Sequence, residues 1–490
     1  MNGPLYIFNG IILTQANPPI YSRSLTVMDG LVHAIDGEPP SGAFMLDLKG
    51  QVMIPGFVDS HLHLIEGSSG MGDVDLRGIT SKEAFRAVLL DAASKVKDGH
   101  WLVAFGWTQE ALGASPDLSW FPEEIQIPIL CYRVDFHSAV MNKFALDGIP
   151  QEEVKDIAGG DEIAQGRVKE DALYSIVCPL IPEQSVLVKQ NRTIRTMRRM
   201  QKHGLTLLGT MEHLSEVRDV LLPLDLQSFM RIRVMCLDEP NNENARLCAS
   251  FENNSFLKCV GFKGFLDGSL GSRTAKMYAP WDDVLGAGVW AGIAADGSVN
   301  SWVKRVAKLG FFPVMHAIGD EAVGVALEAV QDIDAEIQPR IEHAQFIADK
   351  DIPFLSGRMF GVQPLHQVED QKIAIEAVGE KRAGQLHNWR RMLDAGALLS
   401  FGSDWPVAEA NPIAAMRVAI ANGVCPEEAL ESSTSTACAS LDPALTGKLT
   451  VGSFADMVLL DCDPLRCDWE KKQPTVVMTM LEGKIVYEKE

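Results

Sequence analysis

The sequence contains few features that would direct the chain to a membrane or a nucleic acid. None of its apolar runs reaches the ~20 residues needed to span a bilayer. The N-terminus has no basic segment followed by an apolar run and a small-residue cleavage site, so we expect no signal peptide. The 44 Lys and Arg residues are outnumbered by 65 Asp and Glu, which gives a formal net charge of -21. This acidic balance argues against nucleic-acid and anionic-membrane partners.

The cysteines also give no indication of disulfide bonds. The nine cysteines are scattered, odd in number and without a CxxC pair, which is typical of free thiols in a reducing compartment. We therefore expect a cytoplasmic protein. No low-complexity tract is present, and the 47% hydrophobic and 22% charged content is typical of a folded globular chain. The sequence allows a homo-oligomer without predicting one.

The sequence pattern at both ends of the chain is typical of short strands separated by Gly, Asn and Pro turns. The 490 residues allow about three domains by length alone, although one barrel can use more than ~250 residues. The expected terminal strands are 6–14, 24–28, 31–35 and 45–47 at the start and 456–461, 476–482 and 484–487 at the end. We predict that residues 1–52 and 446–490 form one small composite β-sandwich domain.

The middle of the chain contains eight apolar runs, most of them followed by a helical pattern. These candidate strands are 54–58, 128–132, 205–209, 260–266, 311–315, 340–342, 359–362 and 397–401. Eight strand-then-helix units with right-handed crossovers predict an α/β fold, a (β/α)8 TIM-like barrel over residues 53–445. Because the interval 64–127 is longer than one helix needs, we expect inserted segments there, over the barrel mouth.

Polar side chains fall near the carboxyl ends of several predicted strands. Two histidines one residue apart on a strand point to the same face. Since the carboxyl ends of barrel strands meet at one mouth, residues hundreds of positions apart come together there. The residues in question are His61, His63, Lys263, His316, His343 and Asp404. Hydrogen bonds could satisfy each histidine separately, but a carboxylate after an apolar strand needs a cation or donors to meet it.

Several of these segments together resemble one known family. They are residues 55–63 (Pro-Gly-Phe-Val-Asp-Ser-His-Leu-His), 263–275, 316–320, 342–345 (Glu-His-Ala-Gln), 402–407 (Gly-Ser-Asp-Trp-Pro-Val) and 447–460. In order and spacing they resemble the amidohydrolase superfamily, specifically its YtcJ-like branch (amidohydrolase family 3). The resemblance spans nearly the whole chain and implies a metal-dependent hydrolase.

The resemblance also implies a role for each strand-end residue. His61 and His63 would bind the more buried metal ion, and His316 and His343 the more exposed one. Asp404 would contact metal and the attacking water. In related members a strand-four lysine forms a carbamate that bridges two metals, and Lys263 holds that place. An unmodified ammonium has no acceptor and would repel two cations. The alternative for Lys263 is an ion pair with Asp267 or another acid.

The expected chemistry follows from metal-ion electrostatics. One or two divalent ions, expected to be Zn²⁺, lower the pKa of bound water from ~15.7 toward ~7, and the resulting hydroxide attacks a carbonyl carbon. Asp404 would take the proton and deliver it to the leaving nitrogen. We expect hydrolysis of an amide or related non-peptide C–N bond in a small-molecule substrate. Hydrolysis of a lactone or phosphoester, or a catalytically silent ligand-binding barrel, remains open.

A further group of residues is expected to shape the substrate pocket. The candidates for substrate binding are His137, Asp267, Arg273, Trp107 and Trp405. Each has a structural alternative, because Asp135, His137 and Asn142 could cap a helix, glycine-rich turns could explain the loop 267–273, and tryptophans commonly pack in cores. Glu212 is a possible inner-shell acid, while surface placement is favoured for Glu170.

Overall fold

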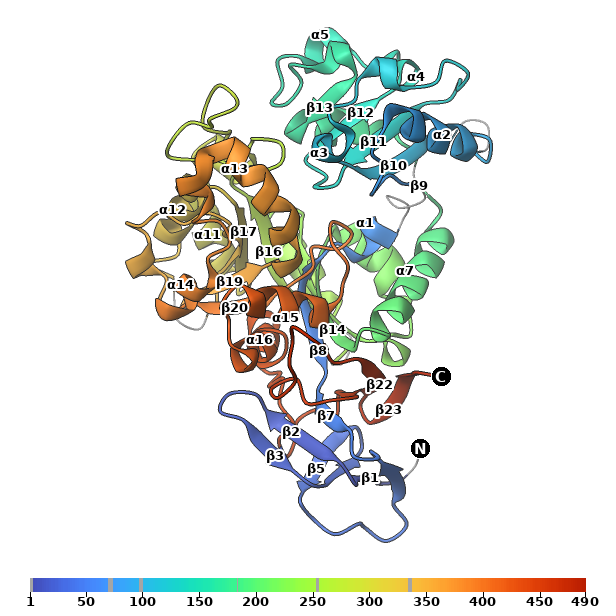
Figure 1. Ribbon diagram of the computed structural model, residues 1–490, viewed down its shortest axis with the longest axis vertical. Coiled ribbons are helices and arrows are strands. Elements are labelled where there is room, and N and C mark those ends of the chain that lie inside the picture. The colour runs from blue at the N-terminus through green and yellow to red at the C-terminus, as the bar shows by residue number, and fades with distance from the viewer. Residues whose placement is uncertain (1–2, 69–73, 97–99, 183, 253–254, 334–336) are drawn as a thin grey trace.

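The computed structural model describes residues 3–68, 74–96, 100–182, 184–252, 255–333 and 337–490 (Figure 1). Its centre is an eight-stranded parallel sheet. In chain order the strands are β8 (Phe57–Leu62), β14 (Leu205–Glu212), β15 (Arg231–Cys236), β16 (Leu257–Phe265), β17 (Phe312–Ala317), β18 (Arg340–His343), β19 (Met359–Val362) and β20 (Leu398–Phe401). A hydrogen bond of 3.2 Å between the hydroxyls of Ser60 and Ser400 links the first and last strands, so the sheet is a nearly closed barrel.

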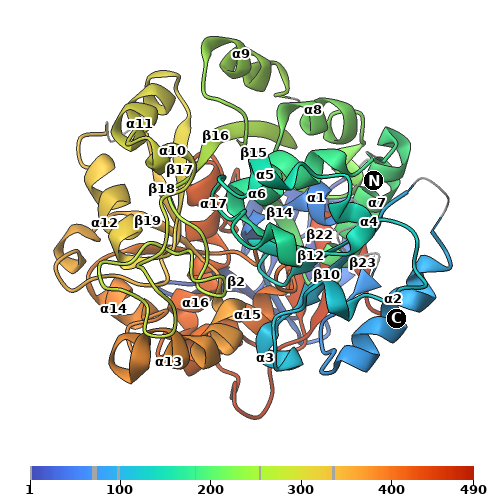
Figure 2. The ribbon, with the colours of Figure 1, turned by 90° about the horizontal axis from the view of Figure 1, so that it is seen from above.

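Helices surround this barrel, as the view from above shows (Figure 2). The longer ones are α7 (Val186–Gln201), α9 (Asn242–Ser250), α11 (Val299–Lys308), α12 (Asp320–Ala329), α13 (Gln367–Ala383), α14 (Trp389–Asp394), α15 (Pro412–Ala421), α16 (Pro426–Ser432) and α17 (Ser435–Leu441). Short helices are α1 (Leu64–Ser68), α6 (Glu170–Ala172), α8 (Leu214–Glu216) and α10 (Gly292–Ala295). In α11, Val299, Trp302, Val303 and Val306 recur at helical spacing and are all buried, which fixes the face that packs on the barrel.

The chain termini form the small sandwich that the sequence predicts. One sheet has the order β5-β4-β1-β6 and the other β23-β22-β21-β7-β2-β3. The strands are β1 (Leu5–Phe8), β2 (Ile11–Gln15), β3 (Ile20–Ser22), β4 (Leu25–Met28), β5 (Leu31–Ile35), β6 (Phe44–Asp47), β7 (Val52–Pro55), β21 (Met457–Leu460), β22 (Val476–Leu481) and β23 (Lys484–Glu488). Leu5, Ile12, Met457 and Met480 belong to one buried cluster, so both termini share a core.

Two strand predictions for the barrel are wrong in detail. The segment 128–132 forms β11 (Ile129–Arg133), which pairs with β10 (Leu102–Trp107) and β12 (Ser138–Met141) outside the barrel. The true third strand is β15, which the sequence pattern hides because Arg231 and Arg233 interrupt its apolar residues. The segment 54–58 is divided at Gly56, where the chain passes from β7 of the sandwich to β8 of the barrel.

A separate five-stranded sheet lies between β8 and β14 in the sequence, and we call it the inserted sheet. Its strands are β9 (Val74–Asp75), β10 (Leu102–Trp107), β11, β12 (Ser138–Met141) and β13 (Arg167–Lys169), accompanied by α2 (Lys82–Ala93), α3 (Gln109–Leu112), α4 (Lys143–Leu146) and α5 (Gln151–Val154). Figure 1 shows it at the opposite end of the barrel from the sandwich. Within the predicted interval 64–127, residues 69–73 and 97–99 lie outside the described residues.

The nine cysteines are free thiols, as predicted. Among the described residues, we find no helix with the length and apolar character that crossing a membrane requires.

Candidate metal centre and substrate cavity

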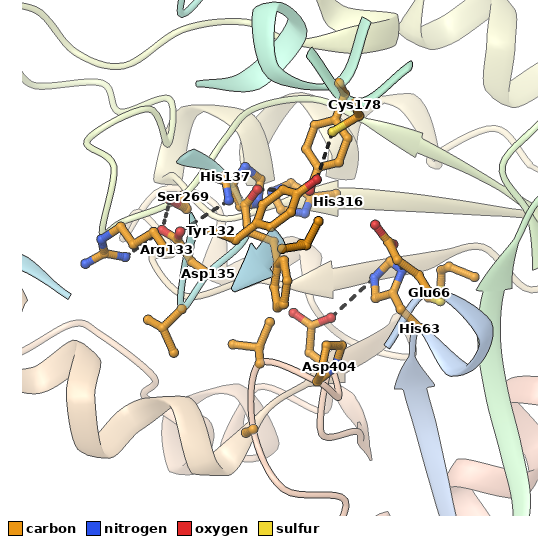
Figure 3. Close-up of a pocket in the computed structure, with 18 of the residues that line it drawn as sticks. His63, Glu66, Tyr132, Arg133, Asp135, His137, Cys178, Ser269, His316 and Asp404 are labelled. Atoms are coloured by element: carbon orange, nitrogen blue, oxygen red, sulfur yellow. Dashed lines mark hydrogen bonds and ion pairs between the residues drawn. The ribbon is translucent and has the colours of Figure 1, made fainter. Parts of the chain in front are cut away.

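A cavity of about 1380 Å³ lies at the carboxyl ends of the barrel strands and beneath the inserted sheet. All six residues predicted at strand ends line it, namely His61, His63, Lys263, His316, His343 and Asp404. The inserted sheet contributes another part of the wall, including Tyr132, Asp135 and His137 (Figure 3). The barrel topology therefore brings together side chains that are up to 343 positions apart, from His61 to Asp404.

His61, His63 and Asp404 form the tightest group of possible metal ligands. Their ligand atoms lie within 4.8 Å of one another. The Nε2 atoms of His61 and His63 are each 3.4 Å from Oδ1 of Asp404. The backbone N–H of Asp404 donates to the His61 carbonyl over 2.7 Å, which holds the segment after β20 against β8. Asp404 itself has a φ of 55°, a left-handed conformation that is uncommon for a non-glycine residue.

Glu342 fixes the orientation of the His61 ring. Its Oε2 lies 2.6 Å from His61 Nδ1, and because a carboxylate only accepts, Nδ1 carries the proton. Nε2 of His61 is then unprotonated and carries a lone pair, and this atom is buried without a hydrogen-bond partner. Although burial opposes it, the nearby Arg340 guanidinium and His61 lower the pKa of Glu342 to about 2. A carboxylate that orients an imidazole in this way is the usual support of a metal-binding histidine.

His316 and His343 are oriented by similar contacts. Nε2 of His316 donates to the Gly268 carbonyl over 3.0 Å, so Nδ1 of His316 is unprotonated and carries the lone pair. Nδ1 of His343 lies 2.9 Å from Oε1 of Gln363, whose amide nitrogen donates to the Gly361 carbonyl, so the lone pair is on Nε2. The two ring centroids are 4.4 Å apart. Burial holds the pKa of both histidines well below the usual range, which favours the neutral form that binds metals.

Lys263 is buried and faces the same cavity from β16. Burial, opposed by the carboxylates of Glu342 and Asp404, lowers the pKa of its amine to about 8. Among the described residues no ion pair joins Lys263 to Asp267, and the acids that attract its amine are Glu342 and Asp404. Asp267 instead accepts hydrogen bonds from the backbone amides of Lys276, Ile318 and Gly319, at 2.8 to 3.3 Å. Burial raises the pKa of Asp267 to about 7.

The inserted sheet places His137 beside the barrel histidines. Its ring centroid is 5.3 Å from that of His316, and its Nδ1 lies 3.0 Å from Oε2 of Glu170. Although burial opposes it, the carboxylates of Glu170 and Asp135 raise the pKa of His137 to about 9. Glu170 is only 7% exposed, so the expectation that it lies on the surface is wrong. Glu170 is the first residue of α6, directly after β13, and this position gave no sequence signal for burial.

The loop after β16 docks the inserted sheet onto the barrel. Ser269 donates to Oδ2 of Asp135 over 2.7 Å, and Arg133 donates to the same oxygen over 2.7 Å (Figure 3). A Cβ on Gly268 would lie 2.4 Å from Oε1 of Glu170, and one on Gly271 would lie 2.0 Å from Nη1 of Arg133. The glycines of this loop therefore allow a close approach that larger residues would prevent.

Other predicted pocket residues lie elsewhere. In the described part of the chain, Arg273, Trp107 and Trp405 are not among the residues that line the cavity. Arg273 pairs with Asp283, Trp107 donates to the Cys131 carbonyl inside the inserted sheet, and Trp405 packs over Gly67. Asn142 caps α4, as its structural alternative proposes. Glu212 is buried and lines the cavity, and burial raises its pKa to about 7.

Sequence reasoning missed the residues that orient others. Glu342 and Gln363 were not selected, although an acid beside a histidine inside an apolar strand, as in Glu342-His343, is a usable signal. Gln345, His366 and Asp370 also line the cavity. Gln345 stands in the segment 342–345 that carries the family resemblance but was not singled out as a site residue, and no motif distinguished His366 and Asp370, which follow the seventh strand.

Comparison with known proteins places this arrangement among relatives. A family model described as "Amidohydrolase family" matches residues 45–487. The Arabidopsis thaliana protein LONG AFTER FAR-RED 3 is 28% identical over 540 residues, covering 99% of this chain and 91% of that protein. YtcJ of Bacillus subtilis (strain 168), a proposed amidohydrolase, is 25% identical over 486 residues, covering 91% of this chain and 90% of YtcJ. The crystal structure of an uncharacterized metal-dependent hydrolase from Pyrococcus furiosus has a TM-score of 0.75 and 29% identity, covering 94% of this chain and 100% of that one.

Proposed function

The chain belongs to the amidohydrolase family, and we propose that it is a metal-dependent hydrolase that cleaves an amide or related carbon–nitrogen bond outside peptides. The observation that carries the proposal is the orientation of the histidines. His61, His316 and His343 each donate one ring N–H to a fixed acceptor, so that the other nitrogen offers a lone pair. The buried, unpartnered Nε2 of His61 is the kind of atom that a metal ion would satisfy.

The donor set fits one or two divalent ions, with zinc the expected metal because imidazole and carboxylate are its usual ligands. His61 and His63 would hold one ion, His316 and His343 a second, and Asp404 would reach the ion held by the first pair. When bound, such an ion acidifies a water and polarises a carbonyl oxygen. Side chains of the protein itself would carry out the proton transfers and bind the substrate.

Lys263 would serve as a carbamate. The lowered pKa of about 8 leaves a useful fraction of the neutral amine near neutral pH. Its nitrogen lone pair forms a bond to the carbon of carbon dioxide and the nitrogen loses a proton to solvent, which leaves an anionic carbamate with two acceptor oxygens. Two acceptor oxygens can serve two cations, whereas the ammonium form would repel them.

Asp404 would move the proton of the reaction. Although burial opposes it, His61 and His63 hold the pKa of Asp404 well below the usual range, which keeps it as a carboxylate, the form that can take a proton from the attacking water. The same oxygen would then donate that proton to the departing nitrogen. His137, whose Nδ1 contacts Glu170 and whose ring lies beside His316, would donate a hydrogen bond to an oxygen of the substrate.

The experiment that tests the proposal combines metal analysis with a substrate panel. Protein produced with zinc supplied should contain one or two equivalents of metal, and it should release amine from some N-formyl or N-acyl compounds. His61→Ala should lose both the metal and the activity. Cleavage confined to lactones, phosphoesters or dipeptides would contradict the bond assignment. Absence of transition metal, or of any turnover by the metal-loaded protein, would overturn the proposal itself.

A further inference from the structure

A second polar cluster borders the cavity on the side formed by β18 and α13. Gln345 lies two residues beyond His343, and Asp370 lies in the first turn of α13. Oδ2 of Asp370 accepts hydrogen bonds from Nε2 of Gln345 and from Nε2 of His387, each over 2.8 Å. These contacts hold the Asp370 carboxylate in one orientation, and neither of them involves the candidate metal ligands.

The cluster leaves acceptor atoms unused. Because the amide nitrogen of Gln345 faces a carboxylate, the other end of the amide must be its carbonyl oxygen. That oxygen, Oε1, is buried without a hydrogen-bond partner, and Gln345 is only 4% exposed. Within the described part of the chain, we find no hydrogen bond to Oδ1 of Asp370. A buried carbonyl oxygen without a donor costs free energy, which a bound donor would recover.

The charges around the cluster favour a cation. Asp370 is paired with the imidazole of His387, whereas its neighbour Glu369 is paired with Lys372 on the helix surface. The cavity lining on this side consists of Gln345, Leu365, His366, Glu369, Asp370 and Ile373, without lysine or arginine. His366 also lines the cavity, and it interacts electrostatically with both Asp404 and Asp370.

The same cavity also has an apolar part of its wall. Leu270, Ile318 and Ile373 all line the cavity and belong to one buried hydrophobic cluster. A substrate that spans this surface would present an apolar chain along it and a polar group at its far end.

We propose that Gln345 Oε1 and Asp370 Oδ1 form a subsite for an ammonium or guanidinium group, carried on the apolar chain of the substrate and remote from the bond that is cleaved. Both atoms are acceptors, and a positively charged donor group satisfies them with charge-assisted hydrogen bonds. The inference rests on the proposed function, because the same molecule must place its carbonyl group at the candidate metal centre.

The test uses a matched pair of compounds with the zinc-loaded full chain. N-(5-aminopentyl)formamide and N-hexylformamide have the same length and differ in a terminal ammonium or methyl group. We expect the wild type to prefer the ammonium compound by about 10-fold or more in kcat/KM, as one charge-assisted hydrogen bond allows. Asp370→Asn should remove that preference, because it should lower kcat/KM for the ammonium compound by about 10-fold more than for N-hexylformamide. Glu376→Gln, on the exposed face of the same helix, is the charge-matched control.

Equal kcat/KM for the two compounds in the wild type, or an equal loss for both in Asp370→Asn, would overturn the subsite. Gln345→Met provides a second variant if Asp370→Asn does not fold. If neither formamide is cleaved, the proposed function fails on these compounds, and calorimetric titration of the same pair decides on the subsite. Tighter binding of the ammonium compound that depends on Asp370 supports the subsite, and equal or absent binding overturns it.

Discussion

The Asp404 carboxylate accepts no hydrogen bond from a lysine or arginine in the described ranges, and its closest basic contacts are the Nε2 atoms of His61 and His63 at 3.4 Å. A side chain in this position can both touch a metal ion and move a proton. Asparagine would keep one oxygen ligand but could not accept a proton. We therefore expect Asp404→Asn to retain most of the bound zinc and to lose roughly 10³-fold in kcat. Elemental analysis and steady-state kinetics check this, and near wild-type turnover would refute the assigned role.

Glu342 acts on His61 without touching the substrate. Its carboxylate makes Nδ1 of His61 the protonated nitrogen and increases the basicity of Nε2. Glutamine keeps the size but removes the charge, so we expect Glu342→Gln to weaken zinc affinity by about 10- to 100-fold. Competition with a chromogenic chelator measures the affinity, and the surface variant Glu376→Gln serves as the control. Unchanged affinity in Glu342→Gln would show that His61 does not need this support.

Glu212 offers a test of pH dependence. Burial raises its pKa from 4.5 to about 7, so the folded state holds this proton while the unfolded state releases it. As the pH rises from about 4.5 to 7, this group therefore destabilises the folded protein progressively, and above about 7 the full cost remains. Glutamine keeps the acceptor for the N–H of Ile65 and the hydroxyl of Thr210.

We expect metal-free Glu212→Gln to gain roughly 2–3 kcal/mol over the wild type between pH 4 and pH 8. Urea unfolding at several pH values measures the difference. A constant difference across this range would mean that Glu212 has an ordinary pKa in the folded protein.

At the scale of whole elements, periodicity identified most of the barrel but could not assign every strand to its sheet. Segments 205–209, 260–266, 311–315, 340–342, 359–362 and 397–401 were recognised because buried parallel strands are continuously apolar. The segment 128–132 satisfies the same rule, yet it pairs within the inserted sheet. A continuous apolar run predicts a strand that is buried on both faces, but it does not predict which strand it pairs with.

The same limit applies to the candidate site. The histidines and Asp404 could be placed because they follow apolar strands, and the barrel brings such ends together. Gln363 and the carbonyl of Gly268 could not be placed in this way, because their role is a hydrogen bond to a histidine on the neighbouring strand. Trp107 and Arg273 were selected by residue type and proximity, but satisfied contacts hold them away from the cavity.

The loop after β16 gives a prediction about the inserted sheet. A methyl group at position 271 would collide with the Arg133 guanidinium, which is 3% exposed and held by Asp135 and Glu110. We expect Gly271→Ala to destabilise the protein by about 1–3 kcal/mol, as overpacking does. It should also expose residues of the inserted sheet to limited proteolysis and lower kcat/KM. Gly148→Ala is the matched control, because the nearest atom to its added Cβ is 3.6 Å away. Equal behaviour of the two variants would contradict a docking role for this loop.

At the scale of the whole molecule, Arg231 joins the barrel to the sandwich. It lies at the start of β15 with 1% exposure, and its guanidinium donates to Asp456 over 2.7 Å and to Glu482 over 2.9 Å. The planar group also lies 3.7 Å from the ring centroid of Phe454. Arg231, which interrupts the apolar pattern of β15 in the sequence, therefore binds the C-terminal strands through its charge, since Glu482 follows β22 directly.

Removing one partner of a buried ion pair leaves the other charge uncompensated, which typically costs about 3–5 kcal/mol. Because Asp456 and Glu482 are 14% and 21% exposed, water can reach them, and we expect Arg231→Ala to cost about 3 kcal/mol in the free energy of unfolding. Arg218→Ala removes an exposed pair with Asp219 and should leave the free energy of unfolding nearly unchanged. Because position 231 lies at the amino end of its strand, opposite the cavity, zinc content and kcat at low temperature should stay unchanged. Urea unfolding and elemental analysis of both variants measure these effects. Loss of zinc in folded Arg231→Ala would mean that the junction with the sandwich also controls the geometry of the barrel mouth.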